Sequence, residues 1–131
     1  MHYKELEKLA LDSGFTHAVP LDTTTISLKQ EVRDMCKNGC QQYARRWSCP
    51  PGCGSLNELR EMICHYKKGI LVQTVTELED EFDWDGMIKA QNRHQEHFHL
   101  FLEKLCAFNP EFLPLGTGCC MICKTCSYPD A

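Results

Sequence analysis

The chain lacks long apolar runs and an excess of positive charge, and each absence excludes a class of protein. No stretch approaches the roughly 18–20 apolar residues that span a bilayer. The polar N-terminus, MHYKELEKLALDSG, lacks the apolar core of a signal peptide. A net charge of −4 gives no general attraction to nucleic acid or to an anionic membrane. We therefore expect a cytoplasmic protein without a nucleic-acid or membrane partner.

Familiar catalytic motifs are also missing from the sequence. It contains no phosphate-binding loop, no Rossmann fingerprint and no recognisable Ser/His/Asp set. The sequence therefore indicates no reaction and no substrate, and an enzymatic function is not the favoured hypothesis.

Cysteine, by contrast, is abundant, with ten in 131 residues. In a small secreted protein this number would indicate a disulfide framework. In a reducing cytosol it favours metal ligation or redox chemistry instead. Because the other features point to the cytosol, we favour metal or cluster binding over a disulfide scaffold.

Residues 33–53, RDMCKNGCQQYARRWSCPPGC, form the first cysteine segment. The spacing is C-x3-C, eight residues, then C-x3-C, and the cysteines are Cys36, Cys40, Cys49 and Cys53. Pro50 and Pro51 remove two amide donors, so this part is neither a helix nor a central strand. A stiff loop with grouped thiolates is typical of a soft-metal or iron–sulfur site.

The second cysteine segment comprises residues 116–126, GTGCCMICKTC. Its Cys120-x2-Cys123-x2-Cys126 spacing resembles the first three ligands of a bacterial ferredoxin run and suits [4Fe–4S] better than zinc. The fourth ferredoxin cysteine is absent. We expect a truncated C-terminal motif, with substitution by Cys119 or by a cysteine of the first segment as the alternative. The first segment either holds a four-ligand site of its own or donates to the second. Because the second segment needs a further ligand, we also expect the two segments to meet in space.

The fold class expected is α/β or α+β, with one domain over residues 1–131. Hydrophobic periodicity and capping signals predict helices near residues 2–13, 27–38, 55–68 and 84–107. Ser27 and Ser55 are predicted N-caps, Asp83 or Asp85 caps the last helix, and Asn109-Pro110 ends it. The sheet is expected to contain 69–76, buried on both faces, together with 16–21 and a short edge strand at 112–115.

Several other residues have ordinary structural explanations that we prefer. Cys64 and Cys106 are expected to be buried. Arg45 and Arg46 either offset thiolate charge or form a solvated basic pair, and we prefer the second explanation. Tyr43 and Trp47 either shield the site or pack in a core. A metal site at His94, His97 and His99 is disfavoured because soft thiolates are available elsewhere.

Beyond these patterns, the chain resembles a family of uncharacterised cysteine-rich proteins labelled as predicted metal-binding and common in anaerobic bacteria and archaea. The resemblance begins with Arg33-x2-Cys36, Asn38-x-Cys40, Tyr43, Trp47-x-Cys49-Pro50-Pro51 and Gly54. It continues through Glu79-Asp80, Phe82-Asp83 and Gly86-Met87, and resumes at Gly118, Cys120, Cys123, Cys126 and residues 128–131. At Cys53 the family usually has an apolar residue, and its pattern extends beyond Ala131. The resemblance implies that the ligands are Cys36, Cys40, Cys49, Cys120, Cys123 and Cys126.

Three function classes follow from this ligand chemistry. The favoured one is an electron-transfer or redox accessory protein with one or two [4Fe–4S] clusters, for which a redox partner protein is a candidate. The second is a zinc-stabilised binding module, and the third is an enzyme that uses a cluster or metal centre.

The first prediction follows from the four-cysteine pattern. Replacing Cys36, Cys40 or Cys49 by serine is expected to remove bound metal and to lower the melting temperature together, because metal ligation orders small cysteine-rich folds. Metal analysis and thermal melts with and without chelator measure both effects. Unchanged metal content and melting temperature in all three variants would exclude these residues as ligands.

Overall fold

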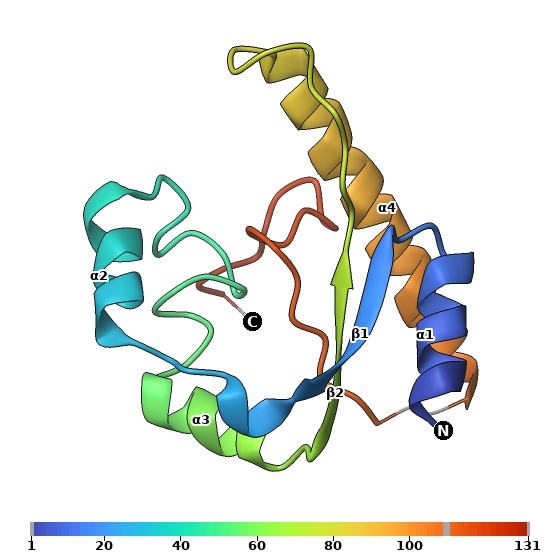
Figure 1. Ribbon diagram of the computed structural model, residues 1–131. Helices are drawn as coiled ribbons and strands as arrows, with labels where there is room; N and C mark the ends of the chain where they lie inside the picture. The colour runs from blue at the N-terminus through green and yellow to red at the C-terminus, as the bar shows by residue number, and fades with distance from the viewer. Residues whose placement is uncertain (1, 109–110, 131) are drawn as a thin grey trace. The chain divides into compact units, whose positions relative to one another are not determined.

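The computed structural model describes residues 2–108 and 111–130 (Figure 1). The elements in chain order are α1 (Tyr3–Asp12), β1 (His17–Asp22), the 3-10 helix η1 (Thr23–Thr25), α2 (Gln30–Gly39), α3 (Leu56–Cys64), β2 (Lys68–Gln73) and α4 (Trp84–Phe108). Helices with an antiparallel sheet confirm the α+β alternative. The expected helix stop at Asn109-Pro110 lies outside the described residues.

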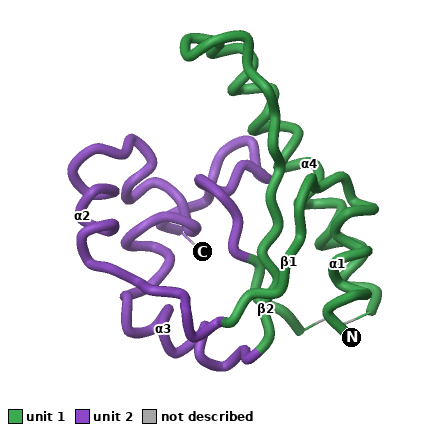
Figure 2. The backbone as a smooth tube through the Cα atoms, viewed as in Figure 1, with its two compact units in different colours: residues 1–22, 68–114 green, residues 23–67, 115–131 purple. Residues whose placement is uncertain are grey.

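Contacts divide the chain into two compact units (Figure 2). Unit 1 comprises residues 1–22 and 68–114, and unit 2 comprises residues 23–67 and 115–131. Most of unit 2 is therefore inserted, in sequence, between the two strands of unit 1. The expectation of one domain over 1–131 stays a prediction.

Unit 1 is built on a two-stranded antiparallel sheet. β1 pairs with β2 so that Ala18 lies opposite Val72 and Val19 opposite Leu71. Because side chains alternate along a strand, only one face of each strand meets the core. The buried apolar residues are Ala10 of α1, Phe15, and Phe101 and Leu105 of α4; Ala18, Ile70 and Val72 pack against them.

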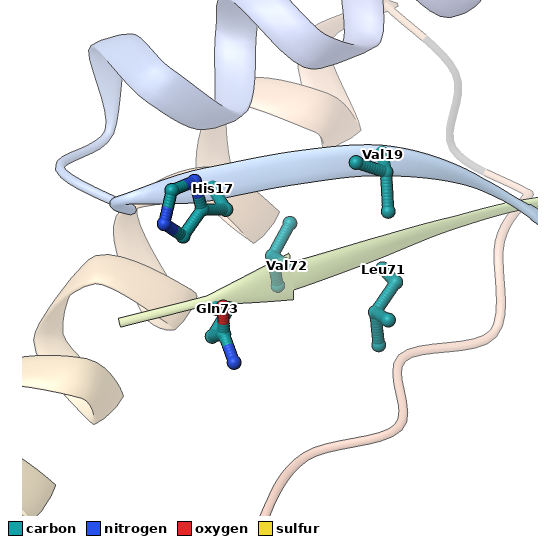
Figure 3. Close-up of a pocket in the computed structure, with 5 residues that line it drawn as sticks. All are labelled: His17, Val19, Leu71, Val72 and Gln73. Carbon is teal, nitrogen blue, oxygen red and sulfur yellow. The ribbon is translucent and has the colours of Figure 1, made fainter. Parts of the chain in front are cut away.

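The other face of the sheet is largely exposed. Val19 is 49% exposed and Leu71 53% exposed, so the prediction that residues 69–76 are buried on both faces is wrong. The strand also ends at Gln73. Side chains from both strands line a shallow pocket of about 360 Å³ on this part of unit 1 (Figure 3); they are His17, Val19, Leu71, Val72 and Gln73.

The end of α1 depends on a glycine. The Gly14 amide donates to the Leu11 carbonyl, and Gly14 has φ +112°, a conformation that side-chain-bearing residues rarely adopt. This turn directs Phe15 into the core. A Cβ atom at Gly14 would lie 2.5 Å from the His97 ring. The position of this ring therefore also requires a residue without a side chain at position 14.

Two of the predicted helix starts are confirmed. The Ser55 hydroxyl accepts a hydrogen bond from the Glu58 amide at 3.2 Å, which completes the expected capping box of α3. At α4, the Asp83 carboxylate accepts from the Gly86 amide at 2.9 Å. Both caps are local, which is why the sequence alone predicts them.

Other boundaries differ from prediction. α2 begins at Gln30 after an N-cap, Lys29, that has no side-chain capping bond, so the Ser27 cap is wrong. α3 ends at Cys64 rather than 68, because the chain leaves the helix early and pairs Gly69 with Leu21 in the sheet.

The expected strand at 112–115 is absent from the described structure. This segment is irregular, although Phe112 still packs on the core of unit 1. Pro114 cannot donate to a sheet ladder, which disfavours pairing here.

The apolar stripe of α4 is buried only in its second half. Trp84 is 64% exposed and Ile88 56% exposed, whereas Phe101 and Leu105 are buried. Cys106 is exposed, contrary to its expected place in the core. No described helix has the combined length and apolarity required to cross a membrane.

The second prediction concerns Gly14. Gly14→Ala is expected to lower the free energy of unfolding by about 3 kcal/mol, because positive φ and contact with the His97 ring both disfavour a Cβ atom. Gly39→Ala is the matched control, since a Cβ there meets no atom within 4 Å. We expect the control to stabilise the protein slightly, by about 0.5 kcal/mol. Equal urea-unfolding free energies for the two variants would contradict this account.

Candidate metal centre

All cysteines except Cys106 belong to unit 2, and all ten are free thiols. α2 places Cys36 in its last turn and ends at Gly39, as expected. Cys40 is the C-cap, and its amide donates to the Cys36 carbonyl at 3.2 Å. The first C-x3-C pair therefore straddles the end of α2.

Arg33 of α2 connects that helix to the second pair of the first segment. Its guanidinium donates to the Cys53 sulfur at 3.4 Å and to the Gly54 carbonyl at 2.6 Å. These two hydrogen bonds join α2 to the second C-x3-C pair. This contact gives Arg33, the first residue of the R-x2-C motif, a defined role.

A closed loop carries the residues between the two C-x3-C pairs. The Ala44 amide donates to the Pro50 carbonyl at 2.8 Å, and Ala44 itself has φ 58°. Arg46, Trp47 and Ser48 lie within this loop.

These three residues bind the second cysteine segment and the residues that follow it. The Arg46 guanidinium donates to the Cys120 carbonyl at 2.9 Å, and the Cys120 amide donates to the Ser48 hydroxyl at 2.9 Å. The Trp47 indole N–H donates to the Ser127 hydroxyl at 3.1 Å. The expectation that the two segments meet in space is therefore confirmed, and the prediction that Arg46 is simply solvated is wrong.

Aromatic packing adds to these hydrogen bonds. The Trp47 and Tyr128 rings meet edge to face with centroids 5.0 Å apart. Gly52 allows this approach, because a Cβ atom there would lie 2.8 Å from the Tyr128 ring. Trp47 is nevertheless 45% exposed, so it packs against Tyr128 at the surface and is not a core residue.

The thiol of Cys49 lies among other sulfur atoms. Burial raises the pKa of the Cys49 thiol, and its hydrogen bond with the Ser48 hydroxyl opposes that shift. The negative charges of three neighbouring thiolates raise this pKa further; the neighbours are Cys119, Cys40 and Cys53. Thiolates that repel one another in this way are those that a metal cation would draw together.

Cys126 has the opposite environment. The backbone amides of Tyr128 and Trp47 lower the pKa of the Cys126 thiol, and the Arg46 charge and the Ser127 amide lower it further. Hydrogen bonds to the charged form stabilise the thiolate. The closed loop thus supports Cys126 as well as Cys120.

Unit 2 also differs from unit 1 in charge. It holds eight Lys and Arg against five Asp and Glu, a net charge of +3, whereas unit 1 holds six against thirteen, a net of −7. This positive surplus would offset part of the negative charge that a thiolate-ligated centre carries. The donor set therefore fits a soft metal or a cluster.

The described residues do not yet form a closed coordination shell. Among residues 2–108 and 111–130, no three His, Cys, Asp or Glu side chains stand in an arrangement that holds a metal ion.

No described residue of unit 2 contributes a buried apolar side chain, since the buried core lies wholly in unit 1. Even Cys64, expected to be buried, is exposed. A small unit without an apolar core requires some other source of order, and ligated metal is one such source.

A family model described as a predicted metal-binding protein (DUF2284) matches residues 19–131. The chain belongs to this family. Its description supports metal binding in general terms, and the match spans both cysteine segments. The comparisons with curated proteins and with solved structures returned no match.

Within this family member, the assigned ligands stay predictions, and the structure adds residues that sequence patterns missed. Ser48 and Ser127 have no motif that marks them as contacts between distant segments. Cys119 is half-buried and electrostatically coupled to Cys49, whereas its neighbour Cys120 is exposed. The sequence offers Cys119 as a possible substitute for the fourth ligand, and the structure adds its proximity to Cys49.

Two histidines of α4, His94 and His97, have a structural role in unit 1. His94 Nδ1 lies 2.7 Å from the Thr74 hydroxyl, and both His94 and His97 pack edge-on against Phe15. Burial lowers the pKa of His94, and the charge of His97 lowers it further. The structure thus gives His94 a hydrogen-bonding and packing function.

The third prediction is a pH dependence that arises from His94. Because its pKa is lowered on folding, the unfolded chain binds the proton more readily, so stability present above about pH 6.5 is lost as the pH falls. His94→Asn removes the titration, and we expect a smaller loss of unfolding free energy between about pH 7.5 and pH 5.5. The exposed His99, changed to Asn, is the matched control. An equal loss in His94→Asn and the parent would refute this assignment.

Proposed function

We propose that unit 2 binds an iron–sulfur centre through cysteines of both segments, and that the protein acts as an electron-transfer or redox accessory protein. The observation that carries the proposal is the packing of the two cysteine segments against each other through Arg46, Trp47 and Ser48. Two cysteine clusters brought to one place offer more thiolates than a single segment can supply.

The ligands come from the seven cysteines with metal-ligand spacing, and Cys119 adds an eighth thiol beside them. Thiolate is the preferred ligand of iron–sulfur clusters and of other soft metals. The seven are Cys36, Cys40, Cys49, Cys53, Cys120, Cys123 and Cys126.

Iron–sulfur binding is favoured over zinc by spacing. Structural zinc sites usually pair two separated C-x2-C knuckles, whereas three cysteines at successive C-x2-C intervals are typical of ferredoxin clusters. Zinc is the alternative outcome of the experiment below.

Such a cluster, when bound, supplies one-electron transfer, and the residues around the thiols would adjust its potential. Hydrogen bonds and positive charge near cluster sulfurs favour the reduced, more negative state. Arg33 beside Cys53 and the amides around Cys126 provide both kinds of contact. These residues therefore support a centre that accepts an electron from a partner protein.

The fourth prediction tests the cofactor. Protein prepared anaerobically is expected to contain iron and acid-labile sulfide in equal amounts and to show a broad visible absorption that bleaches on reduction. Cys49→Ser should lose most of that iron because the Cys49 thiol lies near cysteines of both segments, Cys40, Cys53 and Cys119. Cys106→Ser, in unit 1, is the matched control and should keep the parent's iron.

Colourless protein that contains stoichiometric zinc would refute the iron–sulfur proposal in favour of a zinc module. Equal iron loss in Cys49→Ser and Cys106→Ser would refute the location in unit 2.

A further inference from the structure

The side chains of Arg46, Trp47 and Ser48 hold two distant parts of unit 2 together through contacts that use no cysteine sulfur. We propose that they form a latch that positions the second cysteine segment for ligation before metal binds. This inference rests on the proposed function and adds to it the residues that assemble the site. The latch comprises Arg46, Trp47, Ser48 and Gly52 on one side, and Cys120, Ser127 and Tyr128 on the other.

The latch grips the second cysteine segment at two points. At one point, both backbone groups of Cys120 are used, since its amide donates to Ser48 and its carbonyl accepts from Arg46. At the other, Trp47 binds Ser127 and Tyr128, which follow Cys126. Because both ends of the run from Cys120 to Cys126 are held, Cys123 between them is confined near the first segment.

Ser48 also connects the latch to the Cys49 thiol. Its hydroxyl lies 3.7 Å from the Cys49 sulfur and accepts from the Cys120 amide, so one side chain contacts both cysteine segments. Arg46 is further held by the Gln42 side chain, to which its Nε donates at 2.9 Å. The latch is thus built from side chains that are themselves held in place.

The energetic consequence is preorganisation. A free second segment would supply its thiols only at the effective concentration of a flexible tether. When the latch is closed, the entropic cost of ordering the second segment is part of the free energy of folding. That cost then no longer weakens metal binding. Apparent metal affinity should therefore fall in proportion to the fraction of molecules whose latch remains closed.

The fifth prediction tests this relation in the full-length, metal-free, reduced protein. In a Trp84→Phe background, Trp47 is the sole tryptophan, and acrylamide quenching of its fluorescence reports the open latch. Ser48→Ala combined with Ser127→Ala removes two hydrogen bonds, and Gly52→Ala displaces the Tyr128 ring while keeping every polar group. We expect both variants to raise quenching. Ser27→Ala, an exposed serine outside the latch, should not.

Titration with Co²⁺, read from its thiolate charge-transfer absorption, provides the second measurement. If about nine molecules in ten are open, cobalt affinity should fall roughly ten-fold. Ser48→Thr combined with Ser127→Thr keeps both hydroxyls and should match the parent in quenching and in cobalt affinity, which a general loss of folding in the alanine variant would not explain.

Unchanged quenching in both latch variants would overturn the proposal, and so would increased quenching with parent-like cobalt affinity. Failure of the parent itself to bind cobalt or iron would refute the proposed function. The two failures are therefore distinguishable.

Discussion

The cysteine-bearing unit must be held together without a buried apolar core. Its described residues bury no apolar side chain, whereas unit 1 buries Ala10, Phe15, Phe101 and Leu105. The order of unit 2 therefore depends on polar contacts, each of which contributes only about 1 kcal/mol in net terms. Any group that binds the folded unit, a metal above all, adds directly to its stability. The need for order without a buried core agrees with three features of unit 2: its rigid prolines, its arginines near sulfur and its grouped thiols.

Local chemistry accounts for what the sequence could predict. The caps at Ser55 and Asp83 involve residues three positions apart, and the end of α2 before Cys40 follows from a single glycine. The second half of α4 is buried as its apolar spacing indicates. The family match likewise supports metal binding in general, because the spacing of cysteines is a local pattern too.

Contacts between distant residues account for what the sequence missed. Leu71 belongs to an apolar run that resembles a doubly buried strand, but the number of layers around a sheet is not encoded in the strand itself. Phe112 was assigned to a strand and instead packs from an irregular segment. Arg46 and Ser48 resemble ordinary surface residues until Cys120 is brought beside them. Side-chain hydrogen bonds across more than seventy residues leave no periodic signal.

Most of unit 2 lies between β1 and β2 in the sequence, and this placement fixes the order in which the parts of the protein are synthesised. β1 emerges before the whole first cysteine segment, whereas its partner strand emerges after that segment. The core residues of α4 follow later still, and the second cysteine segment comes last. The first thiols therefore leave the ribosome while the sheet of unit 1 is unpaired, since pairing between residues so distant in sequence has to wait. The two cysteine segments are thus synthesised at different times, and most of unit 1 is synthesised between them.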